Sequence, residues 1–205
     1  MNIVLLGKPG VGKGYISKYF EKDFGFKHIS TGDLCRKNIK EKTKIGQIVE
    51  QFCTCGKLVP LDLILKMLKQ ELKKSKGQSY IFDGFPRNVQ QAQELENIAR
   101  VDAVVLVDVP DDIILDRISK RRVCTVCNKV YSVDEVANET CPTCGENLQV
   151  RPDDNVDIVK KRLLVFETET KPLIEYYKDK IVKIDNSGKL EDTLKQLDTH
   201  FKKVL

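Results

Sequence analysis

The chain has 205 residues, of which 41% are hydrophobic and 32% charged, with a formal net charge of +5 and seven cysteines. This length fits one domain with small inserts, and the composition is that of a folded protein and excludes a disordered chain. No apolar run is long enough for a signal peptide or a membrane span. The odd number of cysteines argues against a secreted disulfide framework. We therefore expect a cytoplasmic protein without membrane contact.

The first motif in the chain is GKPGVGKG at residues 7–14, which follows the apolar run Ile3–Leu6 and precedes a helix-like stretch. Its glycines allow successive backbone N–H groups to face an anion, Lys13 adds a cation, and the start of the helix adds its positive dipole end. We interpret the segment as a phosphate cradle; the alternative is a turn that only joins a strand to a helix. Gly14 stands where the general pattern has a Ser or Thr for Mg²⁺, so a narrower family than the general NTPases is indicated.

Short apolar runs separated by amphipathic stretches predict an α/β fold with a parallel sheet. The predicted strands are Asn2–Leu6, Ser79–Phe82, Ala103–Asp108 and Ile181–Ile184. Two regions interrupt this alternation, at residues 30–59 and 122–152, and we interpret both as inserts. Apolar residues at helical spacing predict core-facing stripes. They are Ile64, Met67, Leu68 and Leu72 in one helix and Val156, Val159, Leu163 and Phe166 in a later one.

The motif DGFPR at residues 83–87 follows a predicted strand, at the end of the sheet where open α/β folds bind ligands. Asp83 could hold Mg²⁺ through water, and Arg87 could donate two hydrogen bonds to a phosphate. The alternative is a turn with a surface ion pair.

Several arginines flank the second insert. Arg117 and Arg121 share a helix face before the insert, Arg122 and Arg151 lie at its two ends, and Arg162 follows it. Singly, each would be read as a solvated surface charge. As a group that converges with the glycine loop, they suit a substrate with many phosphate charges.

Two CxxC pairs lie in the second insert, at Cys124 and Cys127 and at Cys141 and Cys144. Four thiolates at this spacing can surround Zn²⁺ tetrahedrally, and a site with four sulfur ligands leaves no position for water, which predicts a structural metal. Iron is the alternative metal, and a redox CxxC pair is the alternative motif. Free thiols are expected at the remaining cysteines, Cys35, Cys53 and Cys55.

In their order along the chain these segments resemble the adenylate kinases, in the bacterial form whose lid carries zinc. The matching segments are GKPGVGKG, HISTGD, GKLVP, DGFPR, VDVP, DRISKRRVC, the two CxxC pairs, RPDDN and KKRL. The resemblance implies a P-loop NTPase fold with a parallel five-stranded sheet flanked by helices. It divides the chain into a core (1–29, 60–121 and 153–205), an AMP-binding insert (30–59) and a zinc lid (122–152).

The reaction implied by the resemblance is reversible, Mg²⁺-dependent phosphoryl transfer from ATP to AMP, giving two ADP, by a monomer. Such a reaction needs alignment and charge neutralisation more than a strong base. The implied catalytic residues are Lys13, Arg87, Arg121, Arg151 and Arg162, with Asp83 on Mg²⁺ through water. The implied ATP site comprises Gly10, Val11, Gly12, Lys13, Gly14, Tyr15, Arg117, Arg121, Val130, Tyr131 and Gly188. The implied AMP site comprises Thr31, Arg36, Lys57, Leu58, Val59, Gly84, Phe85, Pro86, Arg87, Gln91, Arg151 and Arg162.

Three residues depart from the family's usual pattern. Tyr15 and Asn88 each stand where Thr is usual, and Lys8 stands where a small residue is usual. The change at Tyr15 removes a short hydroxyl from the phosphate loop, whereas Lys8 is expected only to add a surface charge.

Two other functions are weighed against this one. The first is a nucleoside monophosphate kinase for another base. The second is a zinc-ribbon nucleic-acid-binding protein on an NTPase core, suggested by the CxxC pairs, the basic charge and Tyr131. Aromatic residues are sparse around the cysteines, and the arginines accompany the phosphate motifs, so nucleic acid is not the expected partner.

Overall fold

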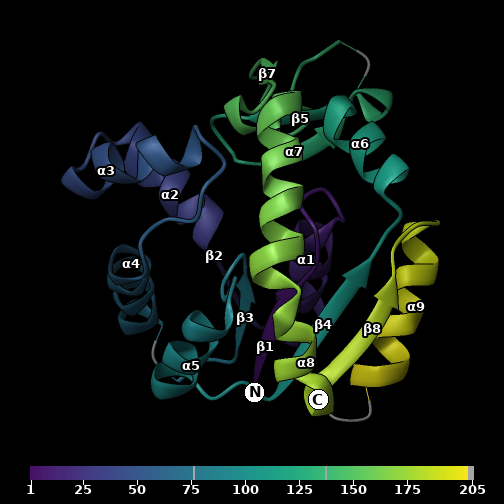
Figure 1. Ribbon diagram of the computed structural model, residues 1–205. Coiled ribbons are helices and arrows are strands. Elements are labelled where there is room, and N and C mark those ends of the chain that lie inside the picture. Colours follow the sequence, from purple (N-terminus) through teal and green to yellow (C-terminus); the bar gives the residue numbers. More distant parts are fainter. Residues whose placement is uncertain (76, 137, 203–205) are drawn as a thin grey trace.

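A five-stranded parallel sheet forms the centre of the computed structural model, which describes residues 1–75, 77–136 and 138–202 (Figure 1). Its strands are β1 (Asn2–Leu6), β2 (Lys27–Ser30), β3 (Tyr80–Asp83), β4 (Ala103–Asp108) and β8 (Ile181–Asp185), in the order β2-β3-β1-β4-β8. All neighbours pair in parallel. The predicted fold class is confirmed, but β2 is not among the four apolar runs because its sequence KHIS is polar at three of four positions.

Helices cover both faces of the sheet, because its inner strands β1, β3 and β4 are apolar on both sides. Val4 and Leu6 of β1 face one hydrophobic cluster, and Ile3 and Leu5 face the other. The helices are α1 (Lys13–Phe24), α2 (Thr31–Lys40), α3 (Lys44–Cys53), α4 (Leu61–Lys74), α5 (Val89–Ile98), α6 (Asp111–Lys120), α7 (Val156–Val165), α8 (Pro172–Tyr176) and α9 (Leu190–Phe201). None of the helices in the described part of the chain combines the length and apolar character that a membrane span requires.

The register of the sheet gathers the predicted phosphate-binding segments at one edge. Asp83, the last residue of β3, lies opposite Leu5 of β1 and Ser30 of β2. The glycine loop after β1, the start of α2 after β2 and the DGFPR turn after β3 therefore meet at the carboxyl ends of neighbouring strands.

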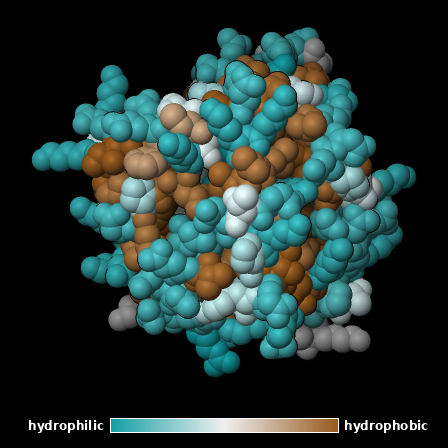
Figure 2. All heavy atoms as spheres, viewed as in Figure 1, coloured by the Kyte–Doolittle hydropathy of each residue, from teal (hydrophilic) through white to brown (hydrophobic). Residues whose placement is uncertain are grey.

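The two predicted inserts have secondary structure of their own (Figure 1). Residues 30–59 contain α2 and α3, which lie to one side of the sheet, and Figure 2 shows apolar side chains gathered at the surface in this region, where Ile48 is 46% exposed. Residues 122–152 contain most of a small antiparallel sheet with the order β6-β5-β7. Its strands are β5 (Arg121–Cys124), β6 (Val130–Ser132) and β7 (Leu148–Gln149). The division into three domains remains a prediction. Residues 76 and 203–205 of the predicted core and residue 137 of the predicted lid lie outside the described residues.

The predicted core stripe on α7 is wrong at its first residue. Val159 and Phe166 are buried, but Val156 is 63% exposed. Val156 begins α7, at the end of the helix that lies beside the lid and away from the five-stranded sheet (Figure 1). At its other end α7 continues through a π-helical turn, Phe166–Thr170, into α8.

Candidate active site

The glycine loop between β1 and α1 has the conformation of an anion-binding turn. Gly7, Gly10 and Gly12 all have positive φ, and Gly12, with φ 91°, caps α1 without a side-chain hydrogen bond to the helix. The Lys13 ammonium folds back over the loop and donates hydrogen bonds to the carbonyl oxygens of Gly7 and Lys8, each at 2.9 Å. Burial lowers the pKa of Lys13 to about 8, with the nearby Asp83 carboxylate opposing the shift.

Asp83 lies beside this lysine at the end of β3. Burial by itself would raise the pKa of Asp83, but His28, Lys13 and Arg87 together hold it below its usual value, so the carboxylate is ionised. The Nε2 atom of His28 lies 3.7 Å from Oδ2 of Asp83. An ionised carboxylate next to a phosphate loop is a suitable ligand for Mg²⁺ or for its water shell. Sequence reasoning did not identify His28, whose only signal is its place in HISTGD.

The predicted arginines converge on the same space. Arg36, Arg87, Arg121, Arg151 and Arg162 all line one cavity of about 670 Å³, together with the glycine loop. Burial and the neighbouring positive charges of Arg36 and Arg121 lower the pKa of Arg151 to about 10. This concentration of positive charge favours a ligand with several negative charges.

Two aspartates hold part of this cluster in place, and both lie in the segment RPDDN. Asp154, whose side chain is wholly buried, accepts two hydrogen bonds from the guanidinium of Arg121, one of them 2.7 Å from Nε. Asp153 accepts from Nη1 of Arg162 at 2.9 Å. Sequence reasoning gave these carboxylates no role, because only the packing pairs each one with its arginine.

The residues predicted for AMP form one hydrogen-bonded group around the DGFPR turn. The carbonyl oxygen of Gly84 accepts from the Thr31 hydroxyl and from Nε of Arg87, both at 2.8 Å. The backbone N–H of Arg87 in turn donates to Oε1 of Gln91 at 2.8 Å. Asn88 caps α5 by accepting from the N–H of Gln91, which is a role that the usual Thr could also fill.

The cavity reaches most of the predicted site residues, but their side chains do not all face it. Those that line it are Gly10, Gly12, Lys13, Gly14, Tyr15, Arg36, Asp83, Gly84, Pro86, Arg87, Arg117, Arg121, Val130, Tyr131, Arg151, Arg162 and Gly188. Predicted residues outside its lining are Val11, Thr31, Lys57, Leu58, Val59, Phe85 and Gln91. Val11 and Phe85 are buried in the two hydrophobic clusters. The lid and α2 also meet, since Lys40 donates to the carbonyl oxygen of Thr125 at 2.8 Å.

The unusual tyrosine and lysine of the loop both contact other elements. The Tyr15 ring lines the cavity, is 40% exposed and lies 5.7 Å from the Lys18 ammonium. Burial and the neighbouring Glu135 carboxylate of the lid raise the pKa of Tyr15. Lys8 forms ion pairs with Asp111 at 2.8 Å and Glu167 at 3.1 Å. The expectation that Lys8 only adds a surface charge is therefore wrong, because its ammonium links the loop to α6 and to the π-helical turn.

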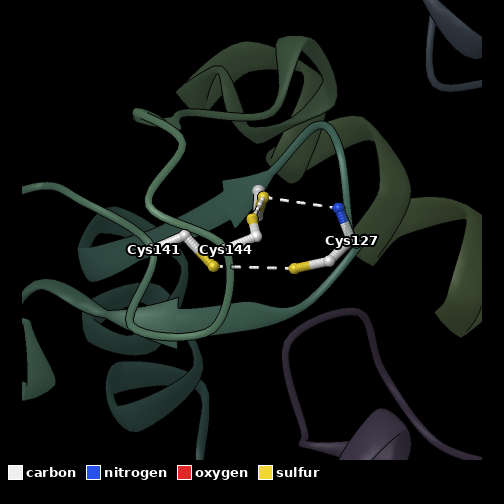
Figure 3. A group of neighbouring side chains, drawn as sticks. Cys127, Cys141 and Cys144 are labelled. Carbon is white, nitrogen blue, oxygen red and sulfur yellow. Dashed lines mark hydrogen bonds between the residues drawn. The ribbon is translucent and has the colours of Figure 1, made fainter.

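The four lid cysteines form a compact group, and Figure 3 labels Cys127, Cys141 and Cys144 of this group. All four sulfur atoms lie within 4.8 Å of one another, with 3.3 Å between those of Cys124 and Cys144 and 3.5 Å between those of Cys127 and Cys141. A tetrahedral Zn²⁺ site with Zn–S bonds of about 2.3 Å separates its sulfurs by roughly 3.8 Å. The residues after each pair, Asn128 and Gly145, have positive φ, as the predicted turns require. This donor set can hold one metal ion.

Comparison with known proteins gives a consistent result. The family model described as adenylate kinase matches residues 5–182 of the chain. The chain is 39% identical to the adenylate kinase of Treponema denticola over 207 residues, which cover 98% of this chain and 99% of that protein. It is 40% identical to the adenylate kinase of Clostridium tetani over 200 residues (93% of each chain), and 38% identical to that of Caldicellulosiruptor saccharolyticus over 208 residues (96% and 97%).

Proposed function

This chain belongs to the adenylate kinase family, whose reaction is phosphoryl transfer between ATP and AMP, and we propose that the arginine-lined cavity is its active site. The observation that carries the proposal is the convergence of the glycine loop, Lys13 and six arginines on one cavity at the carboxyl edge of the sheet. A reaction between two nucleotides brings together many phosphate charges, and this cavity supplies the positive charge to balance them.

On the donor side, we assign the ATP phosphates to the backbone N–H groups of the glycine loop and to Lys13. The helix dipole of α1 adds to this attraction. Arg121 lies at the start of β5, where that strand leads into the lid, and Asp154 fixes the direction of its guanidinium. Arg117, Val130, Tyr131 and Gly188 line the remainder of the donor side and are assigned to the nucleoside.

On the acceptor side, we assign AMP to the group around the DGFPR turn. The contacts of Thr31, Gly84 and Arg87 hold this turn against the start of α2, and Arg36 lies on α2 itself. The guanidinium groups of Arg36 and Arg87 would bind the acceptor phosphate, and Gln91 would lie toward the base. Lys57, Leu58 and Val59 belong to the same proposed site.

The transfer step follows from where the charges lie. Arg87, Arg151 and Arg162 neutralise the negative charge that spreads over the transferred group, and closure of the lid against α2 excludes water. Mg²⁺ bound with ATP would supply further charge neutralisation, and Asp83 is the residue proposed to hold it through water. No strong base is needed, because positioning and charge account for most of the rate in this class of reaction.

The lid cysteines have a separate, structural role in this proposal. Cys124, Cys127, Cys141 and Cys144 would bind one Zn²⁺, since four sulfur donors close the coordination sphere. The lid cluster contains only three buried residues among those described, so a metal would replace much of the missing core. We also propose that the enzyme works as a monomer, because residues of one chain line both sides of the cavity.

The test is to mix the protein with MgATP and each nucleoside monophosphate in turn and to follow the formation of ADP. AMP should support ADP formation far better than GMP, CMP or UMP, and Arg87→Ala should abolish most of it. Preference for another base would favour the other monophosphate kinases. Binding of DNA that weakens steeply with salt, without ADP formation, would favour the nucleic-acid-binding alternative.

A further inference from the structure

A buried asparagine near the C-terminus contacts the phosphate loop near the N-terminus. Asn186 follows β8 and donates through Nδ2 to the carbonyl oxygen of Val11 at 2.7 Å. Its Oδ1 accepts a hydrogen bond of 2.8 Å from the hydroxyl of Thr193 on α9. Asn186 is 6% exposed and Thr193 1% exposed, so water does not compete for either contact. The amide of Asn186 is thereby fixed in one orientation.

This contact determines which way one peptide group of the loop faces. In a trans peptide the carbonyl and the following N–H point in opposite directions, and the bond between Val11 and Gly12 is trans. Because the Val11 carbonyl faces Asn186, the N–H of Gly12 points away from it. Gly12 lines the cavity, and none of the described residues accepts a hydrogen bond from this N–H.

The same asparagine explains a second constraint on Gly12. A Cβ atom at this position would lie 2.4 Å from Nδ2 of Asn186, which is far inside van der Waals contact. The backbone of Gly12 also has φ 91°, a conformation that L side chains rarely adopt. The close approach of Asn186 and the positive φ therefore act together to require glycine.

We propose that Asn186 is a positioning residue for the ATP phosphates, which holds the Val11–Gly12 peptide so that the Gly12 N–H is offered to a phosphate oxygen. The inference rests on the proposed function of the cavity. Asn186 acts through the loop backbone, and Thr193 supports it by holding the other end of its amide.

The first experiment compares two variants in steady-state kinetics. Asn186→Leu keeps a side chain of similar size and removes the donor, so the KM for ATP should rise about 10- to 100-fold through loss of one hydrogen bond to a charged group, with the KM for AMP little changed. Gln196→Met is the matched control. Gln196 ties α9 to the same end of β8 through two 3.0 Å hydrogen bonds with the backbone of Asp185, and its hydrogen bonds do not involve the loop. The KM of the Gln196→Met variant for ATP should stay within about twofold of the parent value.

The second experiment uses ¹⁵N NMR to follow the amide chemical shift of Gly12 during titration with inorganic tripolyphosphate. The resonance should shift strongly in the parent protein and in Gln196→Met, and weakly in Asn186→Leu. An equal rise of the KM for ATP in both variants, or an undiminished Gly12 response in Asn186→Leu, would overturn the proposal.

A milder variant keeps the proposal testable if Asn186→Leu does not fold. Thr193→Val retains Asn186 but frees its Oδ1 atom, so the KM for ATP should rise several-fold, and an unchanged value would count against the positioning role. Failure of the parent protein to form ADP would refute the proposed function only. The response of Gly12 to tripolyphosphate would still decide the role of Asn186.

Discussion

Replacing Tyr15 by Thr restores the short hydroxyl that the phosphate loop lacks. Tyr15 lies in the first turn of α1, where its ring lines the cavity near Lys18 and near Glu135 of the lid. Its phenol oxygen is several bonds farther from the backbone than a Thr hydroxyl, so it cannot replace that hydroxyl beside an ATP phosphate. The expected result of Tyr15→Thr is better use of ATP.

The size of the gain follows from one added hydrogen bond. A net contribution of about 0.5–1.5 kcal/mol corresponds to a roughly two- to twelvefold increase in kcat/KM for ATP. The cost to stability should be small, because the ring is 40% exposed and its contact with the Lys18 ammonium is of the exposed kind, worth about 0.5–1 kcal/mol. For a chain of this size, that is a decrease in Tm of roughly 1–4 °C.

The assay is ADP formation at saturating AMP with ATP varied, run on three variants. Tyr15→Val has the shape of Thr without the hydroxyl, and Tyr15→Phe keeps the ring without the phenol oxygen. Only the Thr variant should gain activity over the parent. Equal values for Thr and Val would refute the missing-hydroxyl explanation, and loss of activity in both would mean that the ring itself positions ATP.

Three further predictions concern charge, metal and pH. Arg87→Ala and Arg121→Ala should each lower kcat, measured as ADP formation, by about 10³-fold or more, and near-parent turnover in both would exclude the charge-neutralisation mechanism. Arg121→Ala should also lower the free energy of unfolding by roughly 3–5 kcal/mol, because it leaves the wholly buried carboxylate of Asp154 without its main partner. Cys141→Ser should lower both bound zinc, measured by elemental analysis, and Tm, and unchanged metal content would argue against the site. Burial alone would lower the pKa of His28, but the Asp83 carboxylate raises it by more, so the net shift of the pKa is upward. The His28–Asp83 pair should therefore stabilise the fold fully below about pH 6.5 and lose that contribution as the pH rises through the raised pKa. A Tm profile from pH 5.5 to 8.5 checks this, since His28→Gln should flatten the decline on the alkaline side.

The sequence predicted those parts of the site whose signal is local. The glycine loop, the DGFPR turn and the CxxC pairs are short patterns in which residue type and spacing indicate the chemistry. The fold brings the loop and the turn to one cavity and the four cysteine sulfurs within 4.8 Å of one another, and the roles of these residues remain predictions. The strand at residues 27–30 was not predicted, because a half-buried edge strand carries polar residues and lacks an apolar run.

The supporting residues could not be predicted, because their partners are distant in sequence. Asp154 acquires its role only when the fold brings Arg121 against it. Asn186 is 175 residues from the carbonyl that it holds, and no local pattern connects the two. The role of Lys8 likewise depends on carboxylates of α6 and the π-helical turn.

The contact between Asn186 and Val11 joins two parts of the chain that are synthesised at different times. The ribosome makes Asn186 175 residues after Val11, so a nascent chain carries the glycine loop without this hydrogen bond for roughly 10–35 s at ordinary elongation rates. β1 likewise cannot pair with either of its neighbours until β3 and β4 have been synthesised, and both follow it by more than 70 residues. A nascent or truncated chain that stops short of Asn186 therefore contains the whole glycine-loop motif but lacks the hydrogen bond that holds the Val11–Gly12 peptide.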